Sequence, residues 1–261
     1  MPIFSELIEA GIVEIRISNP ARRNALSLDM FEALAALWPR LAADPAVEVV
    51  VLRGGGDAFC SGADLSANLD RREGIDALVN QALLKTEFFP KPLIVAIQGA
   101  CVAGGLELAL ASDIRIAADN AVIGLPEVRW GLLPSGGGAM KLVDQIGYAK
   151  AMDLLLTGRL IDGREAERIG LVTEVCPAAA TRDRALERAH MIVANSPAAV
   201  AGAKRAAIAR RASLYGALEN EERALVRGVR ATGDPERGKA AFAERRVPVF
   251  KRGVSTGPAA V

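Results

Sequence analysis

Histidine and cysteine are scarce in this sequence of 261 residues, which has one histidine and three cysteines. The cysteines, Cys60, Cys101 and Cys176, are odd in number and show no CxxC spacing. This pattern disfavours a disulfide framework or a zinc site and fits a reducing compartment. The single histidine, His190, lies in a helical pattern, where a surface or packing role is favoured. A Ser-His-Asp triad and metal chemistry are therefore disfavoured.

Long apolar runs are also missing, since no stretch approaches the roughly 20 residues that a membrane-spanning helix needs. The N-terminal segment carries Glu6 and Glu9 and lacks the basic and apolar regions of a secretory signal. We therefore expect a cytoplasmic protein with no membrane partner. Aromatic residues make up only 4% and hydrophobic residues 51%, so the core must consist mainly of Val, Ile, Leu and Ala.

A large net charge is absent as well, because the formal value is +1, and this alone predicts no polyanionic partner. The charge is uneven along the chain: residues 201–252 carry thirteen Lys and Arg against six Asp and Glu. A solvated helical surface is the favoured interpretation of this excess. The alternatives are a phosphate-bearing ligand and an acidic neighbouring subunit.

Strand and helix patterns alternate through most of the chain. Residues 11–18 alternate in polarity, as in a half-buried strand, and VEVVVLRGGG, PLIVAIQGA, DIRIAA and LVTEVC predict further strands. Ser27 is placed to cap a helix that Pro39 should kink or shorten. Further helical patterns cover residues 72–88, 106–112, 149–157, 163–169 and 180–195.

The composition changes after Ser196 and Pro197. Residues 198–246 are rich in Ala and Arg, favour helix and carry no strand signal. The length suits one large domain, or one domain with an appendage. The sequence therefore predicts an α/β fold, with a mixed core over residues 1–197 and a helical C-terminal region over residues 198–261.

Two segments of the predicted core share one order of features. VVVLRGGGDAFCSGADL and LIVAIQGACVAGGLELAL each contain a buried strand, a glycine turn, small residues, another glycine and a helix start. Each turn would leave backbone N–H groups free before a helix, and such groups bind an anion or a developing oxyanion. Clean GxGxxG and Walker spacings are missing, so GGGAMK, at residues 136–141, is interpreted as a turn and a helix N-terminus.

Two glutamates lie in apolar surroundings. Glu107 is inside the run AGGLELALAS, and Glu127 follows twenty residues later in VIGLPEVRWGLLPSGGG. A buried carboxylate is costly unless it is paired, neutralised or used, and two that converge could be held in different protonation states for acid–base chemistry. Spacing alone favours simpler alternatives: an acid at a helix N-terminus for Glu107 and an ion pair, for example with Arg129, for Glu127.

Five segments resemble, in order and spacing, the signature blocks of the crotonase superfamily, the enoyl-CoA hydratases and isomerases. They are NPARRNALS, DAFCSGADL, CVAGGLELALASDIRIA, GLPEVRWGLLPSGGG and LLTGRLIDGREAERIGLV. The resemblance implies a crotonase-like spiral of ββα turns with a helical C-terminal trimerisation region, which builds trimers that often pair into hexamers. It also implies an acyl-CoA thioester as ligand, with no further cofactor, no metal and no nucleic-acid partner.

The resemblance implies a role for each of four positions. Ala63 and Gly104 match the residues whose backbone N–H groups form the family's oxyanion hole, which would stabilise an enolate of the thioester. Glu107 and Glu127 match the pair found in members that hydrate. In that pattern Glu107 would act as base toward water, and Glu127 would deliver a proton to the α-carbon. Isomerases usually lack the counterpart of Glu107, so the presence of both favours hydration.

Seven further positions match the family's coenzyme A site less specifically. They are Arg22, Arg23, Ser61, Asp64, Leu65, Phe242 and Arg245. The two neighbouring arginines would border the nucleotide, although an exposed loop charge is an equal alternative for each of them. The serine carbonyl would meet the adenine, and the last two residues lie in a C-terminal segment that reaches a coenzyme A site, sometimes a neighbour's.

The sequence departs from the family's commonest pattern close to the predicted site. Ala103 stands where a third glycine is frequent, and Cys60 and Ser61 replace the usual alanines. Trp130 could narrow the acyl pocket, although core packing is the favoured interpretation. The segment 66–89 is where a preference for acyl-chain length would be set.

The sequence thus predicts an enoyl-CoA hydratase, which adds water to a 2-trans-enoyl-CoA and forms a 3-hydroxyacyl-CoA. Other reactions on the same scaffold are the first alternatives, namely double-bond isomerisation, thioester hydrolysis and lyase chemistry. A non-catalytic protein that binds acyl-CoA or RNA is the second. The basic C-terminal region motivates it, but the lack of aromatic stacking residues among those arginines argues against it.

Overall fold

The computed structural model describes residues 2–64 and 73–250, so Leu65 lies outside the described residues. The strands are β1 (Ile3–Glu9), β2 (Gly11–Ile17), β3 (Val47–Gly54), β4 (Leu93–Ile97), β5 (Ala100–Val102), β6 (Ile114–Ala118), β7 (Val122–Gly124) and β8 (Glu174–Cys176). The α-helices are α1 (Leu28–Ala43), α2 (Ile75–Ala82), α3 (Gly104–Ala109), α4 (Gly138–Ile146), α5 (Tyr148–Thr157), α6 (Gly163–Arg168), α7 (Thr181–Val193), α8 (Pro197–Ala231) and α9 (Asp234–Ala243). Short 3-10 helices include η1 (Pro20–Arg22), η4 (Glu127–Trp130) and η5 (Ala178–Ala180).

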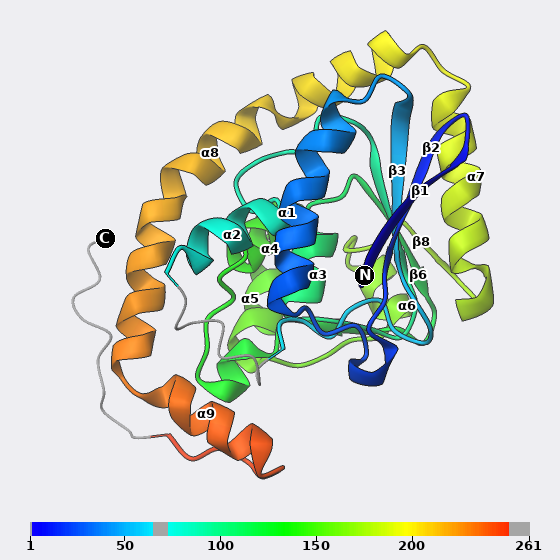
Figure 1. Ribbon diagram of the computed structural model, residues 1–261. Coiled ribbons are helices and arrows are strands. Elements are labelled where there is room, and N and C mark those ends of the chain that lie inside the picture. The colour runs from blue at the N-terminus through cyan, green and yellow to red at the C-terminus, as the bar shows by residue number, and fades with distance from the viewer. Residues whose placement is uncertain (1, 65–72, 251–261) are drawn as a thin grey trace.

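A six-stranded sheet in the order β1-β2-β3-β4-β6-β8 forms the centre of the molecule. The strand β1 is antiparallel to β2, and the remaining neighbours are parallel. Helix α1 lies on one side of this sheet and α7 on the other (Figure 1). Side chains of β3 therefore alternate between two apolar clusters, with Val50 and Leu52 in the larger one and Val49 and Val51 packed toward α7. The predicted α/β class is confirmed.

The two similar segments noted in the sequence lie side by side. Strands β3 and β4 are parallel neighbours, with Val50 opposite Leu93. The chain that follows each strand continues this pairing, because Cys60 forms a parallel bridge with Cys101. The carboxyl ends of parallel neighbours lie at the same edge of a sheet. The two glycine turns consequently meet at one place.

Some predicted boundaries are wrong for identifiable reasons. The helix expected over residues 72–88 is described only as Ile75–Ala82, because Leu84 adopts a positive φ of 49° and the Asn80 side chain accepts the Thr86 N–H instead. Helix α1 does not end early at Pro39 but continues to Ala43. Ser27 is its N-cap residue, as predicted, yet its side chain makes no capping hydrogen bond.

Three strands escaped the sequence analysis. Strand β1 is an edge strand whose side chains are mostly exposed, so it lacks the apolar alternation of a half-buried strand. Strands β5 and β7 span three residues each and form a separate two-stranded sheet. Segments this short carry too few side chains for a period to be recognised.

Helix α8 curves around one side of the molecule, and α9 lies at its lower end (Figure 1). The α8 helix begins where the sequence predicts, since Pro197 is its first residue and the Ser196 hydroxyl accepts a hydrogen bond from the Ala199 N–H. Polar contacts fasten it to the core. The Tyr215 hydroxyl donates to Asp144 over 2.8 Å, and the same ring stacks on Phe88.

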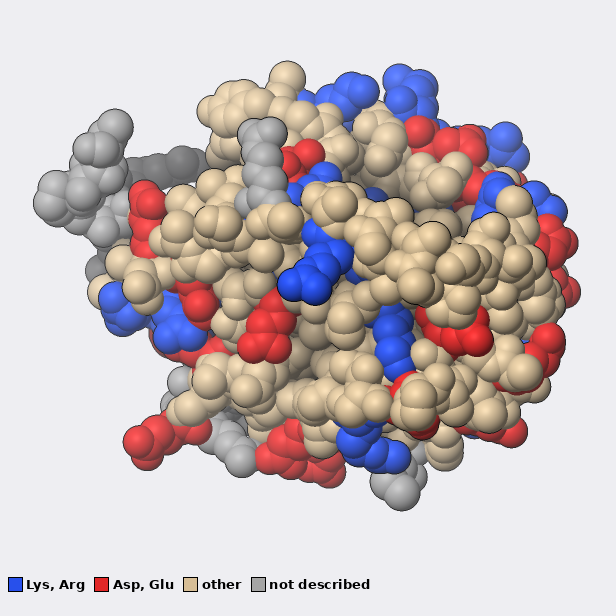
Figure 2. All heavy atoms as spheres, turned by 90° about the horizontal axis from the view of Figure 1, so that it is seen from above, with Lys and Arg blue, Asp and Glu red and all other residues tan. Residues whose placement is uncertain are grey.

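Many cations of the C-terminal region are engaged in ion pairs. The pairs are Lys204–Asp113, Arg211–Asp144, Arg223–Glu219, Arg230–Asp76, Arg237–Asp234 and Arg246–Glu244. Seen from above, acidic and basic side chains are intermixed over the surface (Figure 2). These pairs support the interpretation of the basic excess as a solvated helical surface.

The single histidine and the three cysteines make structural contacts or are buried. His190 lies on α7 with its Nε2 atom 2.8 Å from the exposed Glu9 carboxylate, which confirms a surface role. The thiols of Cys60, Cys101 and Cys176 are buried and free. Among the helices in residues 2–64 and 73–250, none is both long and apolar enough to cross a membrane.

Replacement of Gly216 by Ala is expected to raise the free energy of unfolding by about 0.5–1 kcal/mol. This exposed residue lies inside α8, and a Cβ there would meet no atom within 4 Å. Alanine also favours helix more than glycine does. Gly131→Ala is the contrasting variant, because Gly131 has a φ of 68° and its Cβ would lie 2.6 Å from the Asp234 carbonyl oxygen. Urea unfolding should show opposite shifts, and a lower stability of Gly216→Ala would contradict this prediction.

Candidate active site

Two backbone N–H groups lie next to each other where the glycine turns meet. A Cβ atom on Gly104 would be 3.5 Å from the Ala63 nitrogen, and one on Gly62 would be 3.2 Å from the Gly104 nitrogen. Gly104 is the first residue of α3, where N–H groups have no partner within the helix. Within residues 2–64 and 73–250, neither N–H donates to a protein acceptor. The structure therefore brings together the two predicted oxyanion-hole positions.

Ala103 connects β5 to α3 through a conformation that favours glycine. Its φ is 51° and its ψ is −128°, a region that side chains with a Cβ rarely adopt. The turn is held in place because the Ala103 N–H donates to the Gly124 carbonyl and its own carbonyl accepts from the Glu107 N–H. The strain is thus located directly before the Gly104 N–H.

Ala103→Gly is expected to raise the free energy of unfolding by about 1 kcal/mol. Relief of a strained backbone conformation is worth about 1–3 kcal/mol, and the extra freedom of glycine in the unfolded chain offsets about 0.5–1 kcal/mol of it. Denaturant unfolding measures the difference. A variant less stable than the wild type would show that the Ala103 methyl contributes packing that outweighs its strain.

Glu107 is a buried carboxylate held by a second turn. Its Oε1 atom accepts the Gly136 N–H over 2.7 Å and the Gly138 N–H over 3.0 Å. Gly138 is the first residue of α4, so the partner is the N-terminus of a different helix and not that of Glu107's own helix. The glycine triplet, interpreted from sequence as a turn and a helix start, is the element that binds this carboxylate.

Glu127, the first residue of η4, has no comparable support. Its side chain is buried, and its Oε2 atom has no hydrogen-bond partner among the described residues. An ion pair with Arg129 does not form in this part of the chain, because the Arg129 side chain passes Gly158 instead. The ion-pair alternative considered for Glu127 is therefore wrong in the case of Arg129.

The two carboxylates influence each other and differ in acidity. Burial raises the pKa of Glu107 to about 7, although the two glycine N–H groups oppose this shift. Burial and the nearby charge of Glu107 raise the pKa of Glu127 well above its usual range. Near neutral pH the Glu107 carboxyl group is therefore partly ionised, and burial favours the protonated form of Glu127.

Three more charged side chains are buried near the turn that binds Glu107. Lys141 of α4 is 2% exposed and donates from Nζ to the Leu84 carbonyl over 2.7 Å. Lys85 and Glu222 form an ion pair in which both side chains are buried. Burial lowers the pKa of Lys141 to about 7, which the carboxylates of Glu107 and Glu222 oppose. Sequence reasoning missed all three residues.

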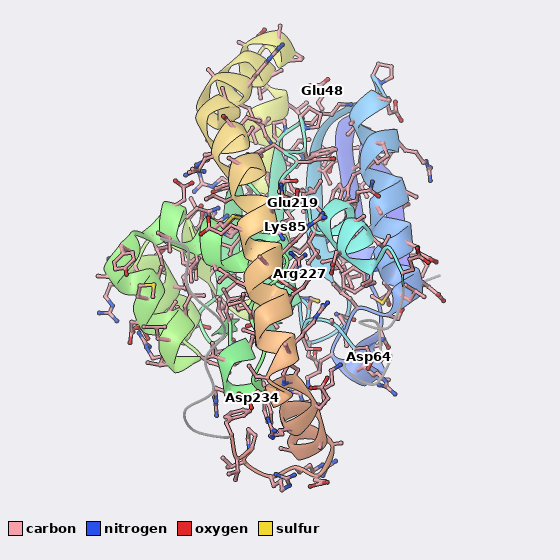
Figure 3. All side chains as sticks on the ribbon, turned by 90° about the vertical axis from the view of Figure 1, so that its left-hand side faces the viewer. Glu48, Asp64, Lys85, Glu219, Arg227 and Asp234 are labelled. Atoms are coloured by element: carbon pink, nitrogen blue, oxygen red, sulfur yellow. The ribbon has the colours of Figure 1, made fainter. Side chains whose placement is uncertain are left out.

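Four of the positions predicted to bind coenzyme A converge beside Ala63. Arg22 contacts both carboxylate oxygens of Asp64, at 3.0 and 2.9 Å. The Ser61 hydroxyl donates to the Arg22 carbonyl, and the Ser61 N–H donates to the Arg23 carbonyl. Figure 3 shows Asp64 near the lower end of the molecule. The loop before α1 and the chain after β3 thus form one polar cluster beside Ala63.

The remaining two positions lie at the end of α9. The exposed Phe242 ring packs edge-on against Trp130, with 5.1 Å between the ring centres. Arg245 follows with a positive φ of 53°, and its N–H donates to the Phe242 carbonyl. Trp130 is only partly buried and packs against an exposed ring, so it does not lie in the core as the favoured interpretation expected. Through this ring contact, α9 packs against η4, the element that carries Glu127.

Comparison with known proteins assigns this chain and its fold to a family. The family model described as "Enoyl-CoA hydratase/isomerase" matches residues 7–253. A carnitinyl-CoA hydratase from Mycobacterium avium has a similar structure, with a TM-score of 0.87, 34% identity, and coverage of 96% of this chain and 98% of that one. The chain therefore belongs to the enoyl-CoA hydratase/isomerase family, the crotonase superfamily, and its fold is the crotonase fold.

Curated relatives span nearly the whole chain. Enoyl-CoA hydratase EchA19 of Mycobacterium tuberculosis is 37% identical over 245 residues, which cover 91% of this chain and 92% of the relative. The 2,3-dehydroadipyl-CoA hydratase of Escherichia coli is 33% identical over 95% of this chain and 99% of its own. The (E)-benzylidenesuccinyl-CoA hydratase of Thauera aromatica is 36% identical, with coverage of 96% and 99%.

Proposed function

We propose that this protein is an enoyl-CoA hydratase, which adds water to a 2-trans-enoyl-CoA and forms a 3-hydroxyacyl-CoA. The observation that carries the proposal is a pair of buried glutamates with different hydrogen bonding, beside two N–H groups that donate to no acceptor among residues 2–64 and 73–250. Glu107 accepts two N–H bonds that stabilise its ionised form, whereas the Oε2 atom of Glu127 has no hydrogen-bond partner in the part of the chain that the structure describes. Hydration needs this combination of a base and an acid.

Each group has a defined task in the proposed reaction. The thioester oxygen accepts hydrogen bonds from the N–H groups of Ala63 and Gly104, which polarises the conjugated double bond. Glu107 removes a proton from water as the oxygen attacks C3, and negative charge moves onto the thioester oxygen. Glu127 then gives its proton to C2, which forms the saturated product and completes the addition of one water molecule.

Support for hydration over isomerisation comes from Glu107. An isomerase has to move one proton between two carbons, for which a single carboxyl group is sufficient. A second carboxylate, held by two N–H groups and partly ionised near pH 7, fits the activation of water. The three curated relatives described above also carry hydratase names.

The proposal includes binding and assembly. Arg22, Arg23, Ser61 and Asp64 would lie along the coenzyme A portion of the substrate, and Phe242 and Arg245 would approach it from α9. The C-terminal helices would build a homotrimer or a dimer of trimers. Thioester activation uses backbone N–H groups and proton transfer uses carboxyl groups, so the proposed reaction needs no metal or redox cofactor. We propose a cytoplasmic location and no nucleic-acid partner.

An assay with paired substrates tests the proposed reaction. Purified protein is given 2-trans-enoyl-CoAs of short and medium chain length, and loss of the conjugated thioester absorbance is followed. The 3-enoyl-CoAs of the same lengths are supplied in parallel. We expect hydration of at least one 2-enoyl-CoA. If 3-enoyl-CoA is isomerised and none of the 2-enoyl-CoAs is hydrated, the protein is an isomerase and the proposal fails.

The pH dependence of hydration should follow the ionisation of Glu107. The base acts only when ionised, and burial raises its pKa to about 7. We therefore expect kcat/KM to rise with pH through about 7, instead of through the usual range of an exposed glutamate near 4.3. A profile from pH 5 to 9 in overlapping buffers of constant ionic strength measures this limb. A constant kcat/KM between pH 5 and 8 would exclude Glu107 as the titrating base.

A further inference from the structure

Two lysine side chains lie next to the turn that binds the Glu107 carboxylate. A Cβ atom on Gly137 would lie 3.1 Å from Cγ of Lys85 and 3.5 Å from Cε of Lys141. Gly137 is flanked by the two residues whose N–H groups bind Glu107. The two lysine side chains therefore lie next to the backbone that orients the carboxylate.

Lys85 is in turn held from α8. Its Nζ atom pairs with Oε2 of Glu222, and the side chains are only 6% and 7% exposed. Figure 3 shows Lys85 beside α8, near Glu219. The Oε1 atom of Glu222 has no hydrogen-bond partner in the described part of the chain. A buried ion pair of this kind costs desolvation energy and is a weak source of stability.

We propose that Glu222 is a positioning residue for the catalytic base: held by Lys85, its carboxylate acts together with Lys141 to set the charge on Glu107. The inference rests on the proposed function, in which Glu107 is the base. It assigns α8, which belongs to the C-terminal helical region, a part in the chemistry of the core in addition to any part in assembly.

The charged groups around the base have opposing effects. Glu107 faces Glu127 from η4, Lys141 from α4 and Glu222 from α8. Glu222 raises the pKa of Glu107, and Lys141 lowers it by a smaller amount. The Glu222 carboxylate itself faces Lys85, Glu219 and Lys141, and Lys141 also faces Arg115.

Substitutions at Glu222 and Lys141 should therefore shift the pKa of Glu107 in opposite directions. Glu222→Gln removes a negative charge, which lowers the pKa of Glu107. Lys141 also loses part of its positive charge, but this opposing effect on Glu107 is smaller. The acid limb of kcat/KM therefore moves to lower pH. Lys141→Met removes a positive charge and moves the limb to higher pH. Each shift should be about one unit, the size typical of the loss of one nearby charge. A change in packing alone would not produce opposite signs.

Glu221→Gln is the matched control, because Glu221 is the exposed neighbour of Glu222 on the same helix and loses the same charge. The Lys85→Met/Glu222→Leu double variant removes both charges while it keeps apolar volume, which is tolerated where a single unpaired charge is not. Because Glu222 raises the pKa of Glu107 and is removed in both cases, this double variant should show the same direction of shift as Glu222→Gln. It therefore decides the matter even if Glu222→Gln fails to fold.

Carbon-13 NMR of the glutamate carboxyl groups separates this inference from the proposed function. The Glu107 signal is assigned by its loss in Glu107→Gln. Its titration midpoint should lie at lower pH in the Glu222 variant and should equal that of the wild type in Glu221→Gln. If this shift occurs and the wild type hydrates no enoyl-CoA, only the proposed function fails. If Glu107 titrates identically in the wild type and in the variants of Glu222, alone or with Lys85, the inference is overturned.

Discussion

Glu107→Gln is expected to lower kcat for hydration by about 10²–10⁴-fold, the usual contribution of a positioned acid or base. The amide keeps an oxygen that accepts the N–H groups of Gly136 and Gly138 but no longer takes a proton from water. KM should change much less, because the oxyanion donors belong to the backbone. Steady-state kinetics with a 2-enoyl-CoA measure both parameters.

Glu127→Gln should cause a loss of similar size by removing the proton donor. When two groups act as a unit, removal of both costs little more than removal of one. The Glu107→Gln/Glu127→Gln double variant should therefore be about as slow as the slower single variant. Undiminished hydration in either single variant would remove that residue from the mechanism, and multiplicative losses would show that the two carboxyl groups act independently.

Gly136→Ala is expected to lower kcat by about 10²-fold while the protein stays folded. A Cβ on Gly136 would lie 2.6 Å from Oε2 of Glu107 and 2.5 Å from Cδ1 of Leu83. The carboxylate must therefore move, and misplacement by about 1 Å costs about this factor. The kinetic measurement is made alongside circular dichroism, which reports the retained fold.

Gly202→Ala is the control for this substitution, because a Cβ on Gly202 meets no atom within 4 Å and the residue lies on α8 far along the chain from the turn. Its kcat should equal that of the wild type. If Gly136→Ala keeps full activity with an intact fold, then the position of the Glu107 carboxylate is not set by the glycine turn.

The sequence predicted the central strands because their side chains leave a strong pattern. Val49 to Leu52 are all buried, on alternate faces of the sheet, and an apolar run between glycine turns has few other interpretations. The extent of α2 could not be predicted, since it ends where the Asn80 side chain binds Thr86. Hydrogen bonds between a side chain and a later backbone group leave no period in the sequence.

The core of the site could be predicted through the resemblance, and its surroundings could not. Ala63 and Gly104 come together because two parallel strands end at the same edge of the sheet, a relation that the repeated order of features suggested. Glu222 lies in the segment ENEERALVRGVR, which has the composition of an exposed helix. Its burial against Lys85 depends on the path of α8 across the core. No local pattern contains that information.

The polar cluster of Arg22 and Asp64 illustrates a similar limit. Both residues were expected at the coenzyme A site, and the sequence did not indicate that they pair with each other. The structure joins them in a two-oxygen ion pair, so a phosphate at this place would compete with Asp64 for the guanidinium group. Sequence position indicates which loop a charge belongs to, whereas its partner depends on how two loops meet.

The central claim is that Glu107 activates water at a site shared with Glu127, and an isotope experiment tests it most directly. Wild-type protein and Glu107→Gln are incubated with a 2-enoyl-CoA in water enriched in heavy oxygen, and the products are analysed by mass spectrometry. The account predicts a 3-hydroxyacyl-CoA with a heavy hydroxyl oxygen from the wild type, and almost none from the variant in the same time. Equal incorporation by both proteins would contradict the account, as would a wild type that only moves the double bond of a 3-enoyl-CoA.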